Sequence, residues 1–479
     1  MLFSTTIHSR RDCYYLTKCL FLLIVALGWT CNLVASFGLH PVTITARHSC
    51  SRRTGRPCAA AVRPLGSTNS GLRWWENVWD PLFQQPHGIT KQAVLDMMDR
   101  SNLRDDFVVV VTGATGGLGQ AMVDVVLEVG GRVWAMDRDP VALSNLVQKQ
   151  RQDRQDKIRT VVADFADLES VARAAREVSE QLAGSPVDIL VNNAGISYSM
   201  DDKDMVNSSH PLLASKQNHD LLFQINYLSH FLLTELLLPQ INQGRIVSVT
   251  SGFSWGVNGT GLVPNGQWDP PASRVVGNQS WPRHLAMAYA HSKLAQIWHM
   301  AELNRRNHPN STTLALCACP SWAATGISGS EEGRRALERL AFPTRPLTDS
   351  EVAGPALGSI VNAMFLPVEE MDPRIWTGEC LLGNANVLES LVPKSKEGRN
   401  HFLFSSWFDR HVMARIDATR EFAVWFVLLL QRWFYQSLYF QPTSAESSNS
   451  TGQALLAGWS RQAVSQWLPT SNGSIEYKD

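Results

Sequence analysis

Residues 107–119 read Phe-Val-Val-Val-Val-Thr-Gly-Ala-Thr-Gly-Gly-Leu-Gly, and this stretch decides how the chain folds. Its first five residues form a continuous apolar, β-branched run, which is typical of a strand buried on both faces. A glycine-rich turn follows, and the apolar residues after it recur with helical spacing as far as Gly130. Val133–Met136 predicts a second strand, which Asp137 ends. These segments form one βαβ unit, the context in which a glycine-rich turn binds a dinucleotide.

The glycines of this turn suit it to a ligand that carries phosphate. Glycine permits a tight turn and lets the backbone approach a pyrophosphate closely. The helix that follows begins with free N–H groups and the positive end of its dipole, and both attract a phosphate. We therefore predict that the turn holds the cofactor through Gly113, Thr115, Gly116, Gly117, Leu118 and Gly119.

Strand-like and helix-like segments continue to alternate after the second strand. Further strands are predicted over 161–163, 187–191, 245–249 and 313–319, and helices over 219–241 and 286–307. This alternation predicts an α/β fold in which a Rossmann-type, doubly wound parallel sheet forms a single main domain. Ligands of such sheets bind at the C-terminal ends of the strands, where the polar residues of interest fall.

Four polar residues in the second half of this pattern can carry acid–base chemistry. Tyr289 and Lys293 are four residues apart, so they share one face of the predicted helix. The lysine ammonium favours a phenolate and is expected to bring the pKa of the phenol closer to neutral. Tyr289 can then exchange a proton with an alcohol or a carbonyl. Ser251 can orient that oxygen, and Asn226 can hold a relay water.

With these residues in place, the chain resembles the short-chain dehydrogenase/reductase family over about residues 104–385. The resemblance rests on Thr112-Gly113-x-x-x-Gly117-x-Gly119, Asp164, Asn192-Asn193-Ala194-Gly195, Asn226, Ser251 and Tyr289-x-x-x-Lys293. The segments 223–234 and 288–295 are similar, more narrowly, to the retinol-dehydrogenase-like branch of that family.

The resemblance implies a role for each residue of this set. Tyr289 is the acid/base, and Lys293 both tunes it and binds the nicotinamide ribose. Ser251 positions the substrate, and Asn226 completes a proton relay. Further cofactor contacts are implied for Asp164 at the adenine, Asn192 on the ribose side, and Phe165, Ala194, Gly195, Pro320 and Thr325. The chain departs from the family where Pro320-Ser321 replaces the usual Pro-Gly, which alters the loop near the nicotinamide.

Asp137 and Arg138 favour different nicotinamide cofactors. An acid at the end of the second strand bonds the adenosine ribose hydroxyls and repels a 2′-phosphate, which favours NAD. The adjacent Arg138 can accommodate that phosphate, as NADP requires. The glycine-rich turn carries no basic residue, so the predicted cofactor is NAD or NADP, with NAD favoured.

The composition excludes several classes of partner. The chain has 479 residues with 43 basic and 43 acidic side chains, and this balance argues against nucleic acid as the main partner. After residue 58 the only cysteines are Cys317, Cys319 and Cys380, which lack the spacing of a disulfide framework or a metal site. We therefore expect a reducing compartment and no metal.

Residues 1–73 have the composition of a targeting sequence. They hold nine basic residues and one acid, and an apolar run extends from Cys19 to Gly28. Residues 1–36 predict a signal peptide, and residues 37–73, rich in Arg, Ser, Thr and Ala, predict a transit peptide. The two together resemble the bipartite plastid presequence of algae, which implies a plastid location. Secretion and an uncleaved anchor are the alternatives.

The remaining boundaries divide the body of the chain into three parts. Residues 74–103 form a lead-in, 104–385 the dinucleotide-binding domain and 386–479 a C-terminal extension with a helix. An insertion, 252–285, separates two of the catalytic candidates. We expect it to form a wall or lid at the substrate mouth, and an inert surface loop is the alternative.

An apolar segment, 421–440, lies in the C-terminal extension. Its nine uninterrupted apolar residues are too few to span a bilayer. Flanking arginines and aromatic residues predict a helix at a membrane interface or over a substrate entrance. A helix packed on the body or in a homo-oligomer contact is the alternative. The polar, Ser-rich residues 441–452 predict a flexible linker.

Together these features predict an NAD(P)-dependent oxidoreductase. We expect it to interconvert an alcohol and a carbonyl on a hydrophobic small molecule, such as an isoprenoid, a pigment or a lipid-derived aldehyde. One alternative is a C=C reductase of the protochlorophyllide type. Another is a non-catalytic NAD(P)-binding sensor or scaffold, because a fold by itself does not decide function.

Overall fold

The structure is a computed structural model. It describes residues 88–197, 214–241, 243–257, 259, 262, 285–307, 313–320, 323, 327, 342–383, 440–443 and 445–469. All of these residues belong to one compact unit, Ser70–Asp479. The predicted presequence, residues 74–87 of the lead-in and residues 421–439 lie outside the described residues.

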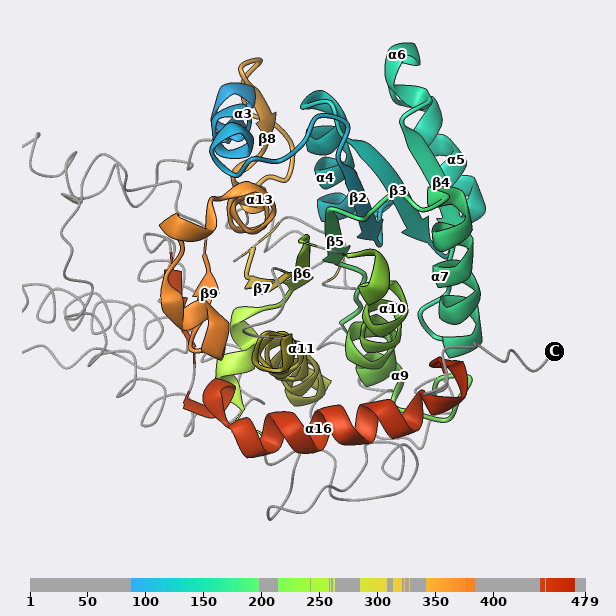
Figure 1. Ribbon diagram of the computed structural model, residues 1–479, viewed down its shortest axis with the longest axis vertical. Helices are drawn as coiled ribbons and strands as arrows, with labels where there is room; N and C mark the ends of the chain where they lie inside the picture. The colour runs from blue at the N-terminus through green and yellow to red at the C-terminus, as the bar shows by residue number, and fades with distance from the viewer. Residues whose placement is uncertain are drawn as a thin grey trace, which may run out of the picture. The chain divides into compact units, whose positions relative to one another are not determined.

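Seven parallel strands form the centre of the fold, which confirms the predicted doubly wound sheet (Figure 1). They are β2 (Val108–Thr112), β3 (Arg132–Asp137), β4 (Ile158–Val162), β5 (Ile189–Asn192), β6 (Arg245–Val249), β7 (Leu314–Ala318) and β9 (Cys380–Leu382). Their order across the sheet is β4, β3, β2, β5, β6, β7, β9. The first strand of this sheet, β2, therefore lies in its interior, and later strands are added on both sides of it. A separate antiparallel pair joins β1 (Ile89–Thr90) to β8 (Glu351–Ala353).

Helices cover both faces of the sheet and enclose an apolar core on each side. One core involves α3 (Lys91–Arg100), α4 (Gly117–Glu128), α5 (Pro140–Gln148) and α13 (Gly358–Phe365). The other involves α7 (Leu168–Leu182), α9 (Leu221–Phe223), η2 (Gln224–Leu228), α10 (Ser229–Leu237) and α11 (Leu285–Asn307). Short helices lie at α6 (Gln152–Gln155), η3 (Leu238–Gln240), η4 (Gly252–Gly256), η8 (Pro355–Leu357), η9 (Val368–Glu370) and η10 (Pro373–Thr377). All residues of β2 are buried between the two layers, which explains its run of valines.

The helix predicted over 219–241 is a continuous run of α9, η2, α10 and η3. Its η2 part is a π-helix, a form often found at functional sites. By length and composition Leu221–Gln240 is the one described helix that could cross a membrane, yet 78% of its apolar window is buried inside the structure. That degree of burial is typical of a core helix.

The C-terminal segment 440–469 closes one sheet edge and covers a helix layer. β10 (Phe440–Pro442) pairs antiparallel with β9, and η12 (Ala445–Ser448) leads into α16 (Ser450–Ala463) and η13 (Ser465–Trp467). Figure 1 shows α16 passing across α11, α10 and α9. Gly452 of α16 lies so close to Trp298 of α11 that a Cβ there would come within 2.6 Å of the indole ring.

The prediction of a flexible linker over 441–452 is therefore wrong. Its polar residues start a helix, since the side chain of Asn449 accepts a hydrogen bond from Gly452 N and so caps α16. The predicted helix over 421–440 cannot include its last residue, because Phe440 lies in β10.

Candidate active site

The glycine-rich turn joins β2 to α4 at the C-terminal edge of the sheet. Gly116 caps α4 without a side-chain hydrogen bond, so no capping side chain uses the N–H groups of the first turn. Gly119 packs against the turn so tightly that a Cβ there would collide with the main-chain oxygen of Gly113. Thr115, Gly117 and Leu118 complete the turn and its first helical positions. The missing side chains leave a cradle that fits the phosphates of a dinucleotide.

Asp137 ends β3 with its carboxylate turned toward the glycine-rich turn. Its Oδ2 accepts hydrogen bonds from the Thr115 hydroxyl at 2.7 Å and from the Thr115 N–H at 3.2 Å. Its Oδ1 accepts the main-chain N–H of Arg138 at 2.8 Å. The Arg138 side chain is exposed and forms no ion pair with a described residue. The carboxylate is thus anchored beside the phosphate cradle, as a ribose-binding acid requires.

Thr112 holds the loop after β5 against the glycine-rich turn. Its Oγ1 accepts the N–H groups of Asn193 and Ala194 at 2.8 and 2.9 Å. The Asn193 amide in turn donates to the main-chain oxygen of Thr112 at 2.9 Å. Gly113 has φ +64°, and a Cβ there would come within 2.9 Å of Ala194 Cα. Both its conformation and this contact therefore require glycine, and the two loops act as one unit.

Asn192 does not point into this site. It is completely buried, and its Nδ2 donates to Thr234 Oγ1 in α10 at 3.0 Å. A direct contact between its side chain and the cofactor ribose is therefore not favoured by the geometry. Asn193, which the sequence analysis left without a role, joins the two loops instead.

Asp164 and Phe165 follow β4, on the side predicted for the adenine. Asp164 is exposed, and its Oδ1 accepts the N–H of Ala166 at 2.9 Å. Its own N–H donates to Ser170 Oγ at 3.0 Å. Phe165 is buried, and its ring centroid lies 4.8 Å from that of His230. Asp164 is therefore accessible to a ligand, whereas Phe165 supports the loop from within.

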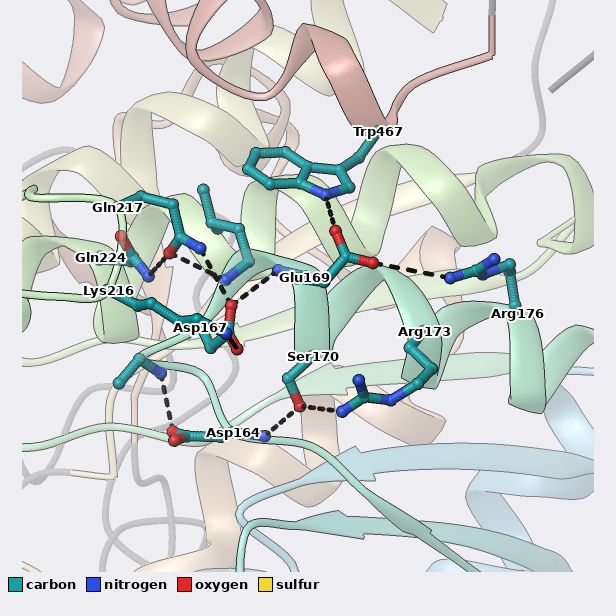
Figure 2. Close-up of polar contacts among 12 residues, drawn as sticks. Asp164, Asp167, Glu169, Ser170, Arg173, Arg176, Lys216, Gln217, Gln224 and Trp467 are labelled. Carbon is teal, nitrogen blue, oxygen red and sulfur yellow. Dashed lines mark hydrogen bonds and ion pairs between the residues drawn. The ribbon is translucent and has the colours of Figure 1, made fainter. Parts of the chain in front are cut away.

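Polar side chains from distant parts of the chain fix the start of α7 beside Asp164 (Figure 2). Asp167 caps this helix by accepting the N–H of Glu169 and also accepts Lys216 Nζ at 2.6 Å. Trp467 of the C-terminal segment donates its Nε1 to Glu169 Oε2 at 2.6 Å. The C-terminal segment thus reaches the adenine side of the predicted cofactor site.

Ser251 and Tyr289 meet just beyond the end of β6, as predicted. Phe253 packs edge-on against the Tyr289 ring with centroids 5.8 Å apart. Burial raises the pKa of Tyr289 above its usual value, and the nearby Ser251 hydroxyl opposes that rise. The prediction of a lowered pKa is therefore wrong for the protein without cofactor, and the phenol is protonated at neutral pH.

Lys293 lies one helical turn from Tyr289 and is almost completely buried. Its Nζ donates to the main-chain oxygen of Val249 at 2.9 Å and lies 5.5 Å from the centroid of the Tyr289 ring. Burial lowers the pKa of Lys293 to about 8. An ammonium group has three N–H donors, so the bond to Val249 leaves donors for ribose hydroxyls. Gly195 is adjacent, since a Cβ there would lie 3.7 Å from Lys293 Nζ.

Asn226, in the π-helix η2, fastens the loop after β5 to helix α11, which carries Tyr289 and Lys293. Its Nδ2 donates to the main-chain oxygen of Ile196 and to Ser292 Oγ, both at 3.0 Å. Its Oδ1 accepts the N–H of Ile196 at 2.9 Å. Ser292 Oγ donates to the main-chain oxygen of Tyr289 at 2.7 Å. Asn226 therefore joins the loop after β5 to the main chain of Tyr289, a contact that the sequence did not predict.

Two residues that the sequence analysis missed hold the main chain of Asn226. His230 Nδ1 lies 3.1 Å from the Asn226 main-chain oxygen, and Gln296 Nε2 donates to the same oxygen at 2.7 Å. A carbonyl oxygen has two lone pairs, so a relay water cannot sit on it as well. Helical spacing is the signal that could have found both, because His230 follows Asn226 by four residues and Gln296 follows Lys293 by three.

Pro320 and Thr325 are the last two predicted positions of this site. Pro320 is buried directly after Cys319, beyond β7. Thr325 and most of the insertion 252–285 lie outside the described residues, so their predicted roles stay predictions.

A phosphate cradle and a tyrosine–lysine pair at one edge of a parallel sheet are the features of dinucleotide-dependent oxidoreductases. Residues 107–261 match the family model described as short chain dehydrogenase. This part of the chain is therefore similar to the short-chain dehydrogenase/reductase family.

The chain is also similar to two relatives with curated names. The chain is 27% identical to the "Dehydrogenase/reductase SDR family member FEY" of Arabidopsis thaliana over 64% of this chain and 75% of that protein. It is 37% identical to the "Dehydrogenase/reductase SDR family member 7B" of Xenopus tropicalis over 30% of this chain and 46% of that protein. The chain thus spans less than half the length of the second relative.

Among solved structures, an uncharacterized protein from Mycobacterium Paratuberculosis is similar with a TM-score of 0.44 and 21% identity. The match covers 76% of this chain and 96% of that one.

Proposed function

We propose that this protein transfers a hydride between a nicotinamide cofactor and the carbonyl or alcohol carbon of a small molecule. The observation that carries the proposal is the position of Tyr289, whose ring lies 5.5 Å from the Nζ of buried Lys293, beside the Ser251 hydroxyl. These three groups lie at the edge of the sheet that holds the phosphate cradle. General acid–base chemistry on an oxygen substituent needs this combination.

The chain's own residues supply the proton and its stabilisation. In the reductive direction Tyr289 starts as a protonated phenol, because burial raises its pKa. It donates that proton to a carbonyl oxygen, which the Ser251 hydroxyl holds by a hydrogen bond. Lys293 is charged below about pH 8 and stabilises the phenolate that remains. The cofactor, when bound, supplies the hydride to the carbonyl carbon.

We further propose a hydrophobic substrate. Phe253 packs against Tyr289, and Val257 and Leu262 farther along the same segment are buried. An apolar surface next to the reacting oxygen excludes water and favours a substrate with an apolar body. An isoprenoid, a pigment or a lipid-derived aldehyde has this character.

Replacing Tyr289 by Phe tests the proposal. The variant removes the proton donor and leaves the ring, so turnover should fall by at least about a hundredfold. Oxidation of NADH and NADPH with a panel of apolar aldehydes and ketones measures this. Binding of each cofactor, followed by fluorescence, is the control and should change by less than about twofold. Unchanged turnover in the variant would contradict the acid/base role.

Two other outcomes would favour the alternatives. Turnover that depends on illumination would indicate a C=C reductase of the protochlorophyllide type. Cofactor binding without turnover of any substrate would indicate a sensor or scaffold. The plastid location, a membrane contact through 421–440 and the oligomeric state rest on the sequence alone and stay predictions.

We propose NAD rather than NADP as the preferred cofactor, because the Asp137 carboxylate is anchored beside the cradle. A 2′-phosphate would face this negative charge. The variant Asp137→Asn keeps an acceptor for Thr115 and removes the charge. We expect it to lower kcat/KM for NADH by about tenfold and to narrow the preference over NADPH. A wild-type enzyme that prefers NADPH, and that loses the preference in Arg138→Ala, would reverse the assignment.

A further inference from the structure

His230 is a buried histidine that the proposed reaction does not use directly. It lies on α10 and is 2% exposed. Its Nε2 lies 3.0 Å from Thr112 Oγ1, and its Nδ1 lies 3.1 Å from the main-chain oxygen of Asn226. Burial lowers the pKa of the ring to about 3, so His230 is neutral near pH 7.

The partners of His230 decide which ring nitrogen carries the proton. A main-chain oxygen can only accept, so Nδ1 carries the hydrogen and donates it to Asn226. Nε2 of the neutral ring is then an acceptor, so the Thr112 hydroxyl donates to it. The lone pairs of Thr112 Oγ1 remain for the N–H groups of Asn193 and Ala194, both of which they accept.

These hydrogen bonds form one connected series between the phosphate cradle and Tyr289. It begins at the loops that flank the phosphate cradle, passes through Thr112 and the His230 ring, and ends at the main chain of Asn226. The side chain of Asn226 continues it to Ser292, which bonds the main chain of Tyr289. Each step has a fixed donor and acceptor, so the orientation of His230 fixes the orientation of the others.

We propose that His230 is a positioning residue. It couples the loops after β2 and β5, which flank the phosphate cradle, to helix α11, which carries Tyr289. The inference rests on the proposed function, since it assigns one end of this series of hydrogen bonds to cofactor binding and the other end to proton transfer. Without the ring, the Thr112 hydroxyl can turn toward the main-chain oxygen of Val191, which lies 3.3 Å away. The main chain of Asn226 then keeps only Gln296 as a side-chain donor.

Two amide variants test the two hydrogen bonds of His230 separately. In His230→Asn the amide nitrogen takes the place of Nδ1 and keeps the bond to Asn226, but the side chain is too short for Thr112. In His230→Gln the amide oxygen takes the place of Nε2 and keeps the bond to Thr112. Each variant therefore removes one contact and retains the other.

The two variants should affect different measurements. We expect His230→Asn to raise the Kd for the reduced cofactor, measured by fluorescence titration, by about five- to tenfold, with kcat within about twofold of wild type. We expect His230→Gln to lower kcat by about five- to tenfold, with the Kd little changed. His230→Leu should show both defects.

His299 provides the matched control. It is a buried histidine on α11, and its ring packs 4.8 Å from Phe231. His299→Asn and His299→Gln remove a buried ring of the same kind from the same core. They should lower the melting temperature but leave both Kd and kcat unchanged, which shows the effect of a purely structural role.

The wild-type protein gives a readout that does not depend on turnover. With ¹⁵N-labelled histidine, we expect one NMR signal of a neutral ring protonated at Nδ1 that does not titrate between pH 5 and 9. This signal should be absent from His230→Gln. The opposite tautomer, or titration in this range, would overturn the inference.

The inference also fails if both amide variants change Kd and kcat in the same proportion, or if they change only the melting temperature. A wild-type protein that binds cofactor but turns over no substrate would contradict the proposed reaction. The Kd of His230→Asn would still decide whether His230 positions the cofactor loops. A wild-type protein that binds neither cofactor would contradict both.

Discussion

Asp220 shows how burial sets the behaviour of a single residue. It caps the helix that carries Asn226, since its Oδ1 accepts the N–H of Phe223 at 2.7 Å, and it is almost fully buried. Burial raises the pKa of this carboxyl to about 6. The folded chain therefore holds a proton that the unfolded chain loses near pH 4. The contribution of Asp220 to stability falls as the pH rises from about 4 to 6 and stays low above that range.

The variant Asp220→Asn tests this dependence, because asparagine caps a helix equally well and never ionises. We expect it to raise the free energy of unfolding at pH 8 by up to about 3 kcal/mol, with little effect near pH 4. Urea unfolding of both proteins across this range measures the difference. A difference that does not vary with pH would show that the charge is not the cause.

The residues that form the candidate site were predictable from sequence motifs, but the surroundings of their side chains were not. Tyr289, Lys293, Ser251 and Asn226 come together as their order in the sequence predicts. The direction of the Tyr289 pKa was predicted wrongly, because the sequence shows the neighbouring lysine but not how deeply the ring is buried.

Helix α16 contains one glycine that packs against another helix and one that does not, so the two can be compared. Gly452 lies against the indole ring of Trp298, where a Cβ would come within 2.6 Å, whereas nothing lies within 4 Å of a Cβ at Gly458. Gly452→Ala should lower the free energy of unfolding by about 1–3 kcal/mol, because the two helices must separate. Gly458→Ala should raise it by about 0.5–1 kcal/mol through helix propensity. Chemical denaturation of both variants measures this, and equal effects would contradict the packing.

Elements were predictable where periodicity was strong. The strand over 245–249 agrees with β6 residue for residue, and the helix over 286–307 differs from α11 by one residue at its start. The π-helix η2 was not predicted, because residues 224–228 have the same spacing of apolar residues as an ordinary helix. The start of α16 was missed because its cap residues have the composition of a linker.

The C-terminal segment joins parts of the whole molecule that lie far apart in the chain. It adds β10 to the sheet edge at β9 and buries a hydrogen bond between Tyr227 and Ser460 at 2.8 Å. Near its end, Trp467 bonds Glu169 at the start of α7. Removing it would expose apolar residues of α11 to water and leave the edge of β9 unpaired.

We therefore expect a chain that ends at residue 439 to melt at least about 5 °C below the full chain. The matched control is a chain that ends at residue 469, which keeps every described contact and should melt as the full chain does. Differential scanning fluorimetry measures both. Equal melting temperatures for the two shortened chains would show that the segment does not stabilise the fold.

By itself the sequence determined the local features of this protein: the buried strands, the glycine cradle at 113–119, and the order of the acid–base residues. These features follow from side-chain type and spacing over a few residues, which periodicity and conformational preference control. The tertiary structure alone decided the depth of burial at Tyr289, the bonds that His230 makes and the path of residues 440–469. Each of these depends on contacts between segments distant in the chain, because a pKa or a hydrogen bond responds to neighbours in space.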